Sequence, residues 1–206
     1  MTALIFNYSR NDVMVAMDTL GHYPNKQQFI HHTKFYYFKE ERVIICGVGI
    51  AGLKKDWYEF ILYKQINKDI LTLDRLATKK LLEFDKLYPN ELGATIYQFG
   101  YNNRTDEFMG FAYRKSNGFI SEALEYGITA RPGIEDSFVI KAPDIAEIIV
   151  SGSNFNRIHH PFIEIMKEQK RADDMEDIDN RAFIGGEIEL ISINKDSCSV
   201  DTIYKF

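Results

Sequence analysis

Segments with the signature of paired β-strands occur near the beginning, in the middle and near the end of the chain, and helical segments separate them. Apolar and β-branched runs flank short polar turns in MTALIFNYSRNDVMVAMD, ATIYQFGYNNRTDEFMGFAYR and GEIELISINKDSCSVDTIYKF. This pattern predicts antiparallel hairpins. The order of elements departs from the regular β-α-β-α alternation of a doubly wound parallel sheet, and it predicts an α+β protein of stacked, mainly antiparallel sheets with helices outside.

The first third of the chain contributes four of the expected strands. They are predicted at Ala3 to Tyr8, Val13 to Met17, Thr33 to Phe38 and Arg42 to Gly49. β-branched and aromatic residues are frequent in the last two of these segments, as is typical of strands. Both faces of these two strands are apolar, so we expect their sheet to be covered on both sides.

Helical spacing of apolar residues predicts helices in two parts of the chain. One helix carries Leu53, Trp57 and Ile61, and a second is capped by Thr72 and ends before Pro89. Further on, we expect a short helix over 144–150 and a longer one over 155–171, with a proline in its first turn or at a kink. The stretch FISEALEYGI remains ambiguous between strand and helix.

Length and composition describe one globular domain over residues 1–206. Hydrophobic residues make up 45% and charged residues 27% of the chain, and the net charge is −5. Without a basic stripe, we expect no nucleic-acid partner. Cys46 and Cys198 give no disulfide framework, which indicates a reducing compartment. We see no signal peptide and no run of membrane-spanning length, so we expect no membrane partner and a cytoplasmic protein.

We predict no metal site. The histidine pairs at 31–32 and 159–160 point apart on a strand or helix, and no carboxylate stands at ligand spacing. The acidic run DDMEDID over 173–179 favours a solvated connection over a cation site, because it lacks the glycine of an EF-hand loop.

Three residues in the first part of the chain stand at the positions of a known constellation. Thr2 precedes the first strand, Asp18 follows the second in VMVAMDTLG, and Lys34 opens the third in HHTKFYYF. Once Met1 is removed, these spacings match without a gap those of the proteasome β-subunit family, which belongs to the N-terminal nucleophile hydrolases. The next segment, VIICGVGIAG, falls where that family has a strand, a glycine-containing turn and its first helix. The chain resembles this family mainly over its first fifty-odd residues.

The chemistry of these residues is coherent in itself. A threonine hydroxyl becomes a good nucleophile only when a base takes its proton, and a free α-amine with a pKa of about 8 can be that base. A nearby lysine lowers the pKa of the amine by charge repulsion, and a buried carboxylate holds that lysine in place. We therefore expect Thr2 as nucleophile, Lys34 and Asp18 as electrostatic support, and the backbone amides near Gly47 as hydrogen-bond donors to the developing oxyanion.

The resemblance implies a four-layer αββα sandwich and a threonine-type hydrolase of peptide or amide bonds. It implies a homo-oligomer, typically a ring, and no cofactor. The substrate, the ring size, the removal of Met1 and any unfoldase partner stay open.

Further along the chain, the sequence departs from the family pattern. The family has an Asp and a Ser just before a Gly-Gly pair, and here Arg181 and Ile184 stand at those positions before Gly185 and Gly186. The family's glycine-serine turn falls in YGITARPG, where Thr129 supplies the only hydroxyl apart from the tyrosine. A divergent amide or peptide substrate fits these departures.

Five residues occupy positions that line or flank the family's specificity pocket: Gly21, His22, His32, Tyr36 and Cys46. The segment at Gly21 and His22 would pair with an extended substrate as an added strand. Structural roles are open alternatives, with Cys46 as a small buried apolar residue, His32 as a loop residue and Tyr36 as part of the core.

Two other functions compete with the hydrolase. Gly47, Gly49 and Gly52 form G-x-G-x-x-G between a predicted strand and a helix, and Asp74 follows about twenty residues later, as in a dinucleotide-binding fingerprint. Alternatively, the glycines only allow close packing of the helix on the sheet. The third hypothesis is a non-catalytic, proteasome-like subunit that assembles or binds a partner and retains Met1.

Overall fold

A computed structural model describes residues 2–22, 29–133 and 159–206 of the chain. Within these ranges the protein is an α+β structure of twelve strands, three α-helices and one short 3₁₀ turn at Lys115–Asn117. Every strand pair is antiparallel. The predicted fold class of mainly antiparallel sheets with helices is therefore confirmed. The expected helix over 144–150 lies outside the described residues.

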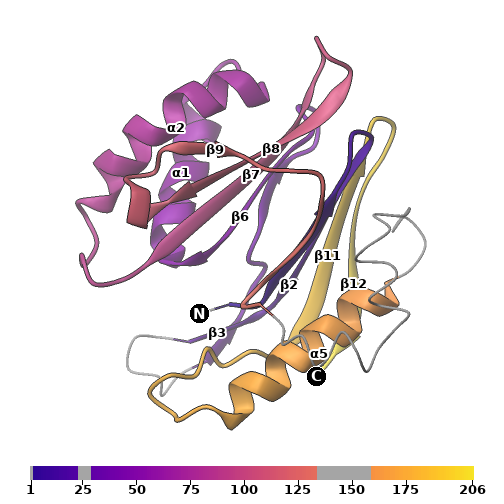
Figure 1. The fold of residues 1–206 in the computed structure, drawn as a ribbon. Coiled ribbons are helices and arrows are strands. Elements are labelled where there is room, and N and C mark those ends of the chain that lie inside the picture. The colour runs from indigo at the N-terminus through magenta and orange to yellow at the C-terminus, as the bar shows by residue number, and fades with distance from the viewer. Residues whose placement is uncertain (1, 23–28, 134–158) are drawn as a thin grey trace.

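Two five-stranded sheets form the body of the molecule (Figure 1). The first has the order β10-β1-β2-β11-β12, with the bounds β1 Leu4–Tyr8, β2 Asp12–Asp18, β10 Gly127–Arg131, β11 Glu187–Asn194 and β12 Cys198–Lys205. The second has the order β5-β6-β7-β8-β9, with the bounds β5 Tyr36–Phe38, β6 Val43–Gly49, β7 Ala94–Asn102, β8 Glu107–Arg114 and β9 Ser121–Ala123. A separate ribbon pairs β3 Leu20–His22 with β4 Phe29–His31.

The alternation of side chains along β1 and β2 explains how the first sheet packs. Leu4 and Phe6 join a cluster that also contains Tyr97 and Phe99 from the second sheet. Ile5, between Leu4 and Phe6, joins a different cluster with residues of α5. Because successive strand residues point to opposite faces, the consecutive apolar residues Leu4, Ile5 and Phe6 fit a sheet that is covered on both sides.

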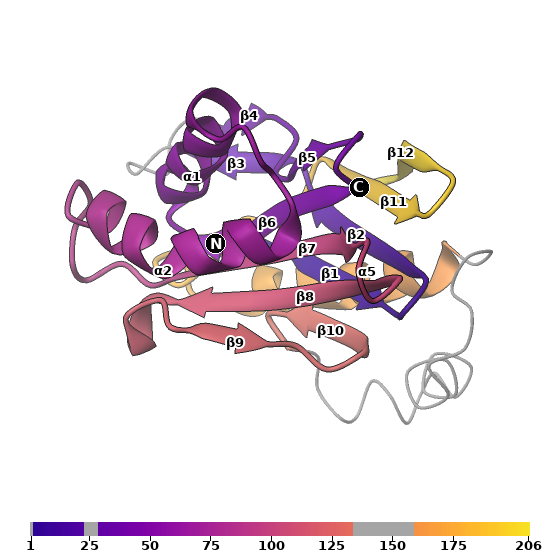
Figure 2. The same ribbon diagram turned by 90° about the horizontal axis from the view of Figure 1, so that it is seen from above.

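The helices lie on the outer faces of the two sheets, as Figures 1 and 2 show. Helices α1 Ala51–Lys64 and α2 Ile70–Asp85 pack on the second sheet through one buried cluster. Helix α5 His160–Met175 packs on the first sheet through another. The core between the two sheets is the remaining cluster. The succession is thus helices, sheet, sheet, helix.

Three of the four helix predictions are confirmed in position and corrected at their ends, and residues 155–158 of the last one lie outside the described residues. The cap of α2 is Asp69 instead of Thr72, because the Asp69 carboxylate accepts the Thr72 amide at 3.0 Å. Pro161 lies in the first turn of α5, as expected. The acidic run does not form a solvated connection throughout, since Asp173 is a buried residue of α5. The ambiguous stretch FISEALEYGI supplies the whole of β9 and the beginning of β10.

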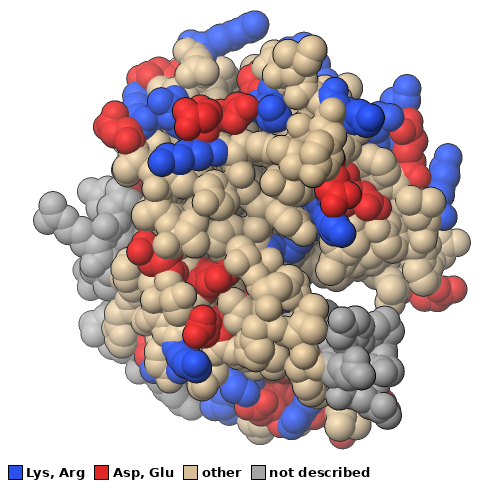
Figure 3. Space-filling model, turned by 180° about the vertical axis from the view of Figure 1, so that it is seen from behind, with Lys and Arg blue, Asp and Glu red and all other residues tan. Residues whose placement is uncertain are grey.

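The described surface carries mixed charges. On the face seen in Figure 3, basic and acidic residues stand side by side instead of gathering into one large area of a single sign. No helix among the described residues is long and apolar enough to cross a membrane.

Candidate active site

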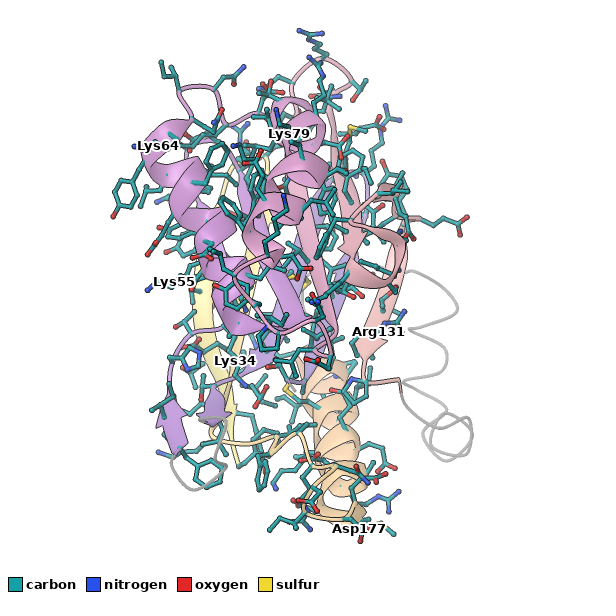
Figure 4. The ribbon with its side chains drawn as sticks, turned by 90° about the vertical axis from the view of Figure 1, so that its left-hand side faces the viewer. Lys34, Lys55, Lys64, Lys79, Arg131 and Asp177 are labelled. Atoms are coloured by element: carbon teal, nitrogen blue, oxygen red, sulfur yellow. The ribbon has the colours of Figure 1, made fainter. Side chains whose placement is uncertain are left out.

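Four chain segments meet at one end of the space between the two sheets. The residue after Thr2 leads into β1, Asp18 ends β2, Lys34 lies just before β5, and Gly47 lies in β6. Figure 4 shows Lys34 beside the lower part of α1 and close to the β3 and β4 ribbon. Hydrogen bonds join Asp18 to Lys34 and to Ala3, the residue after Thr2. Gly47 lies on β6 beyond the last residue that pairs with β5.

A buried ion pair forms the centre of this site. The Lys34 ammonium lies 2.8 Å from the Asp18 carboxylate, and both side chains are almost completely removed from solvent. The ammonium also donates to the Leu20 carbonyl at 2.5 Å. Burying two charges is costly unless further hydrogen bonds satisfy them, so these contacts are needed to keep the pair in place.

The Asp18 carboxylate also binds two backbone amides. One oxygen accepts the Ala3 amide at 3.0 Å, and the other accepts the Gly185 amide at 3.2 Å. Burial raises the pKa of Asp18, while Lys34 and the two amides oppose that shift. Burial likewise lowers the pKa of Lys34, and Asp18 opposes this. The hydrogen bonds therefore favour the ionised pair.

Thr2 is half-buried beside this pair. The next residue, Ala3, is fully buried and donates its amide to Asp18. One peptide unit thus separates Thr2 from the carboxylate that binds Lys34, which places the threonine at the edge of the charged cluster.

The register of β6 turns the Gly47 amide away from β7, toward the side on which β5 lies. Tyr101 donates to the Arg42 carbonyl, and alternate residues of an antiparallel strand face the same partner, so the Gly47 amide faces away from β7. On that other side, β5 pairs with β6 only from Tyr36 opposite Ile45. Continuing this register would place Lys34 opposite Gly47, so the ladder stops just where the site begins.

Glycine is required at position 47 by packing. A Cβ atom there would lie 2.4 Å from the Thr95 carbonyl oxygen on the neighbouring strand. The absence of a side chain therefore keeps β6 close to β7, whatever further role the amide has.

The five predicted pocket residues come from β3, β5, β6 and the residue after β4. Gly21 and His22 lie in β3, and the His32 ring packs so closely on Gly21 that a Cβ there would lie 2.6 Å from it. Burial and the positive charges of Lys34 and Lys54 lower the pKa of His32. Tyr36 begins β5, where it is half-buried.

Cys46 is fully buried in the core between the sheets. Burial raises the pKa of its thiol to about 12. The thiol is therefore neutral at ordinary pH, which agrees with the alternative that treats Cys46 as a small apolar residue.

The expected pairing of a substrate with Gly21 and His22 has one structural restriction. These residues already pair with Ile30 and Phe29 of β4. An added strand would have to use the opposite edge of β3, since one edge is occupied within the chain.

Sequence reasoning missed a second buried lysine at this site. The Lys54 ammonium donates to the Lys34 carbonyl, and the side chain is buried. Burial lowers the pKa of Lys54 to about 8. A signal for this position exists in the sequence, because Lys54 stands at helical spacing from the buried residues Ile50, Trp57 and Ile61.

A second missed residue is Asp173, which anchors the loop before β11. Its carboxylate accepts the Ala182 amide at 2.5 Å and the Ile184 amide at 3.0 Å. Gly185, the next residue of this loop, donates to Asp18. Arg181 and Ile184, which stand where the proteasome β-subunit family has an Asp and a Ser, thus belong to a loop that the Asp173 carboxylate holds in place.

The surroundings of the G-x-G-x-x-G motif differ from those of a dinucleotide-binding unit. That fingerprint belongs to a parallel βαβ unit, whereas α1 is followed by α2 and by β7, which is antiparallel to β6. The space beside Gly52 is filled by the Tyr88 ring. The Asp74 carboxylate accepts the hydroxyls of Tyr113 and Ser121 at 2.8 and 2.5 Å. These contacts favour the packing role for the glycines.

No three His, Cys, Asp or Glu side chains of the described residues come together as a metal site would require. The sequence matches no model of a known protein family, and no curated protein matches it.

Proposed function

We propose that this protein is a threonine-type N-terminal nucleophile hydrolase that cleaves a peptide or amide bond, and that its layers form the four-layer αββα sandwich of that class. The observation that carries the proposal is the Asp18 carboxylate, which binds both Lys34 and the amide that follows Thr2. Burying an ion pair costs desolvation free energy. Its position next to a half-buried threonine supports a role in activating that threonine.

In the proposed reaction, removal of Met1 leaves Thr2 with a free α-amine. The amine takes the proton of the Thr2 hydroxyl as the oxygen attacks the substrate carbonyl. The Lys34 ammonium keeps the amine neutral by charge repulsion. The Gly47 amide donates to the oxyanion of the tetrahedral intermediate. The amine then protonates the leaving nitrogen, and the ester on Thr2 remains until water hydrolyses it to the acid.

Intact mass spectrometry with a β-lactone tests this function. The lactone ring opens on a nucleophilic hydroxyl and leaves an acyl ester of added mass. We expect natively expressed protein to lack Met1 and to gain one adduct, which peptide mapping locates on Thr2. The Thr2→Ala variant should gain none, while Thr33→Ala, which removes an exposed hydroxyl next to Lys34, should be labelled like the wild type.

A retained Met1 together with no adduct would overturn the hydrolase and favour the non-catalytic, proteasome-like subunit. An adduct that persists in Thr2→Ala would place the nucleophile elsewhere. The proposed homo-oligomer is tested separately by light scattering, since assembly does not depend on a reactive threonine.

A further inference from the structure

The charges buried at this site do not balance. Lys34 and Lys54 supply two ammonium groups, and Asp18 supplies one carboxylate. Among the described residues, Lys54 makes no ion pair, and its hydrogen bond goes to the neutral Lys34 carbonyl. The Asp18 oxygens are already occupied by Lys34 and two amides. A buried cation without a counter-charge is costly, so its retention requires a reason beyond folding.

The surroundings of Lys54 connect it to the predicted pocket. Its ammonium lies 6.0 Å from the centre of the Tyr36 ring. It is also close enough to Cys46 for each group to affect the pKa of the other. It further contributes to the lowered pKa of His32. Of the predicted pocket residues, Tyr36 therefore lies next to this cation, and His32 and Cys46 lie within the range of its charge.

We propose that Lys54 is the specificity-determining residue of the site. It selects a substrate with a carboxylate side chain next to the scissile bond, an assignment that rests on the proposed hydrolase function. The carboxylate would supply the counter-charge that the protein itself lacks. A charge-assisted hydrogen bond in a site of low dielectric is strong, and an uncharged isostere would leave the ammonium without a counter-charge.

The neighbouring residue Lys55 provides a matched control. Its side chain is 61% exposed and forms a surface ion pair with Glu59 at 3.6 Å. Figure 4 shows Lys55 on the outer side of α1. Replacing Lys55 thus removes the same charge from the same helix without changing the charge inside the site.

The binding experiment uses N-acetylated, C-amidated tetrapeptides that differ only by glutamate or glutamine at one position. Isothermal titration calorimetry measures their binding to the Thr2→Ala variant, so recognition is read without turnover. We expect the glutamate peptide to bind about 10- to 100-fold more tightly, the range of a hydrogen bond to a charged group. Adding Lys54→Met should abolish that difference, and adding Lys55→Met should leave it. Equal binding of the two peptides, or a preference that survives Lys54→Met, would overturn the proposal.

Two further measurements keep the outcomes separate. Thermal unfolding reports whether Lys54→Met folds, and Lys54→Gln removes the same charge with a polar side chain if it does not. The β-lactone adduct on Thr2 reports the hydrolase independently. An adduct without glutamate preference defeats only the assignment of Lys54, whereas glutamate preference without an adduct defeats only the hydrolase.

Discussion

The amide of Gly185 donates a hydrogen bond to the carboxylate of Asp18 at 3.2 Å, although 167 positions separate the two residues in the chain. This contact joins the loop before β11 to the end of β2. The same carboxylate binds Lys34 and the Ala3 amide, so three segments distant in sequence depend on one side chain.

We expect Asp18→Asn to destabilise the fold and abolish acylation of Thr2. The change leaves the Lys34 ammonium buried without its counter-charge, a loss of about 3–5 kcal/mol. Urea unfolding measures the stability, and the β-lactone adduct measures the reactivity. Asp201→Asn, on the exposed part of β12, should change neither. A stable Asp18→Asn variant with normal acylation would contradict the role given to the ion pair.

Gly47→Ala tests the strand on which the oxyanion would be held. A methyl group there meets the Thr95 carbonyl at 2.4 Å, so β6 must shift from β7 at a cost of about 1–3 kcal/mol. The shift also moves the Gly47 amide, and acylation of Thr2 should slow. Gly93→Ala is the control, since a Cβ atom added there would meet nothing within 4 Å. Normal stability and acylation in Gly47→Ala would show that neither packing nor the amide position matters here.

The parts of this fold that could be predicted from sequence are those that local patterns encode. Ile5 and Phe6 are both apolar, which indicates a strand covered on two faces, and they do enter different cores. Turn residues between apolar runs predicted the hairpins of β1 with β2, β7 with β8, and β11 with β12.

The parts that could not be predicted depend on partners far away in the chain. A lysine on a helix is usually exposed, and Lys54 is buried because a carbonyl from another segment lies within its reach. Asp173 belongs to an acidic run that reads as solvated, yet loop amides supplied by residues 182 and 184 bind its carboxylate. Pairing of Asp18 with Lys34 was predictable only because their spacing matches a known constellation.

Asp173→Asn tests whether α5 supports the site. An asparagine has one acceptor oxygen in place of two, so one of the amides of Ala182 and Ile184 loses its partner. We expect a loss of about 1–3 kcal/mol and faster hydrogen exchange at Gly185, with slower acylation of Thr2. Asp174→Asn, its exposed neighbour, should be close to neutral. An unchanged rate of hydrogen exchange at the Gly185 amide would show that α5 does not support the site.

Lys54→Met should make the protein more stable at neutral pH, because a buried cation is replaced by an apolar side chain of similar shape. The expected gain is on the order of 1–4 kcal/mol. The pKa of Lys54 is lowered from 10.5 to about 8 in the folded protein, so above pH 8 the folded state holds fewer protons than the unfolded state. The stability of the wild type relative to Lys54→Met therefore rises between pH 8 and 10.5, and the advantage of the variant shrinks over that interval. Urea unfolding of both proteins at pH 7, 8, 9 and 10 measures this difference, in which the groups common to both proteins cancel. Lys55→Met should show no such trend. A stability gain of Lys54→Met that stays constant across these pH values would mean that Lys54 keeps its ordinary pKa, which would contradict its role as a destabilising buried charge.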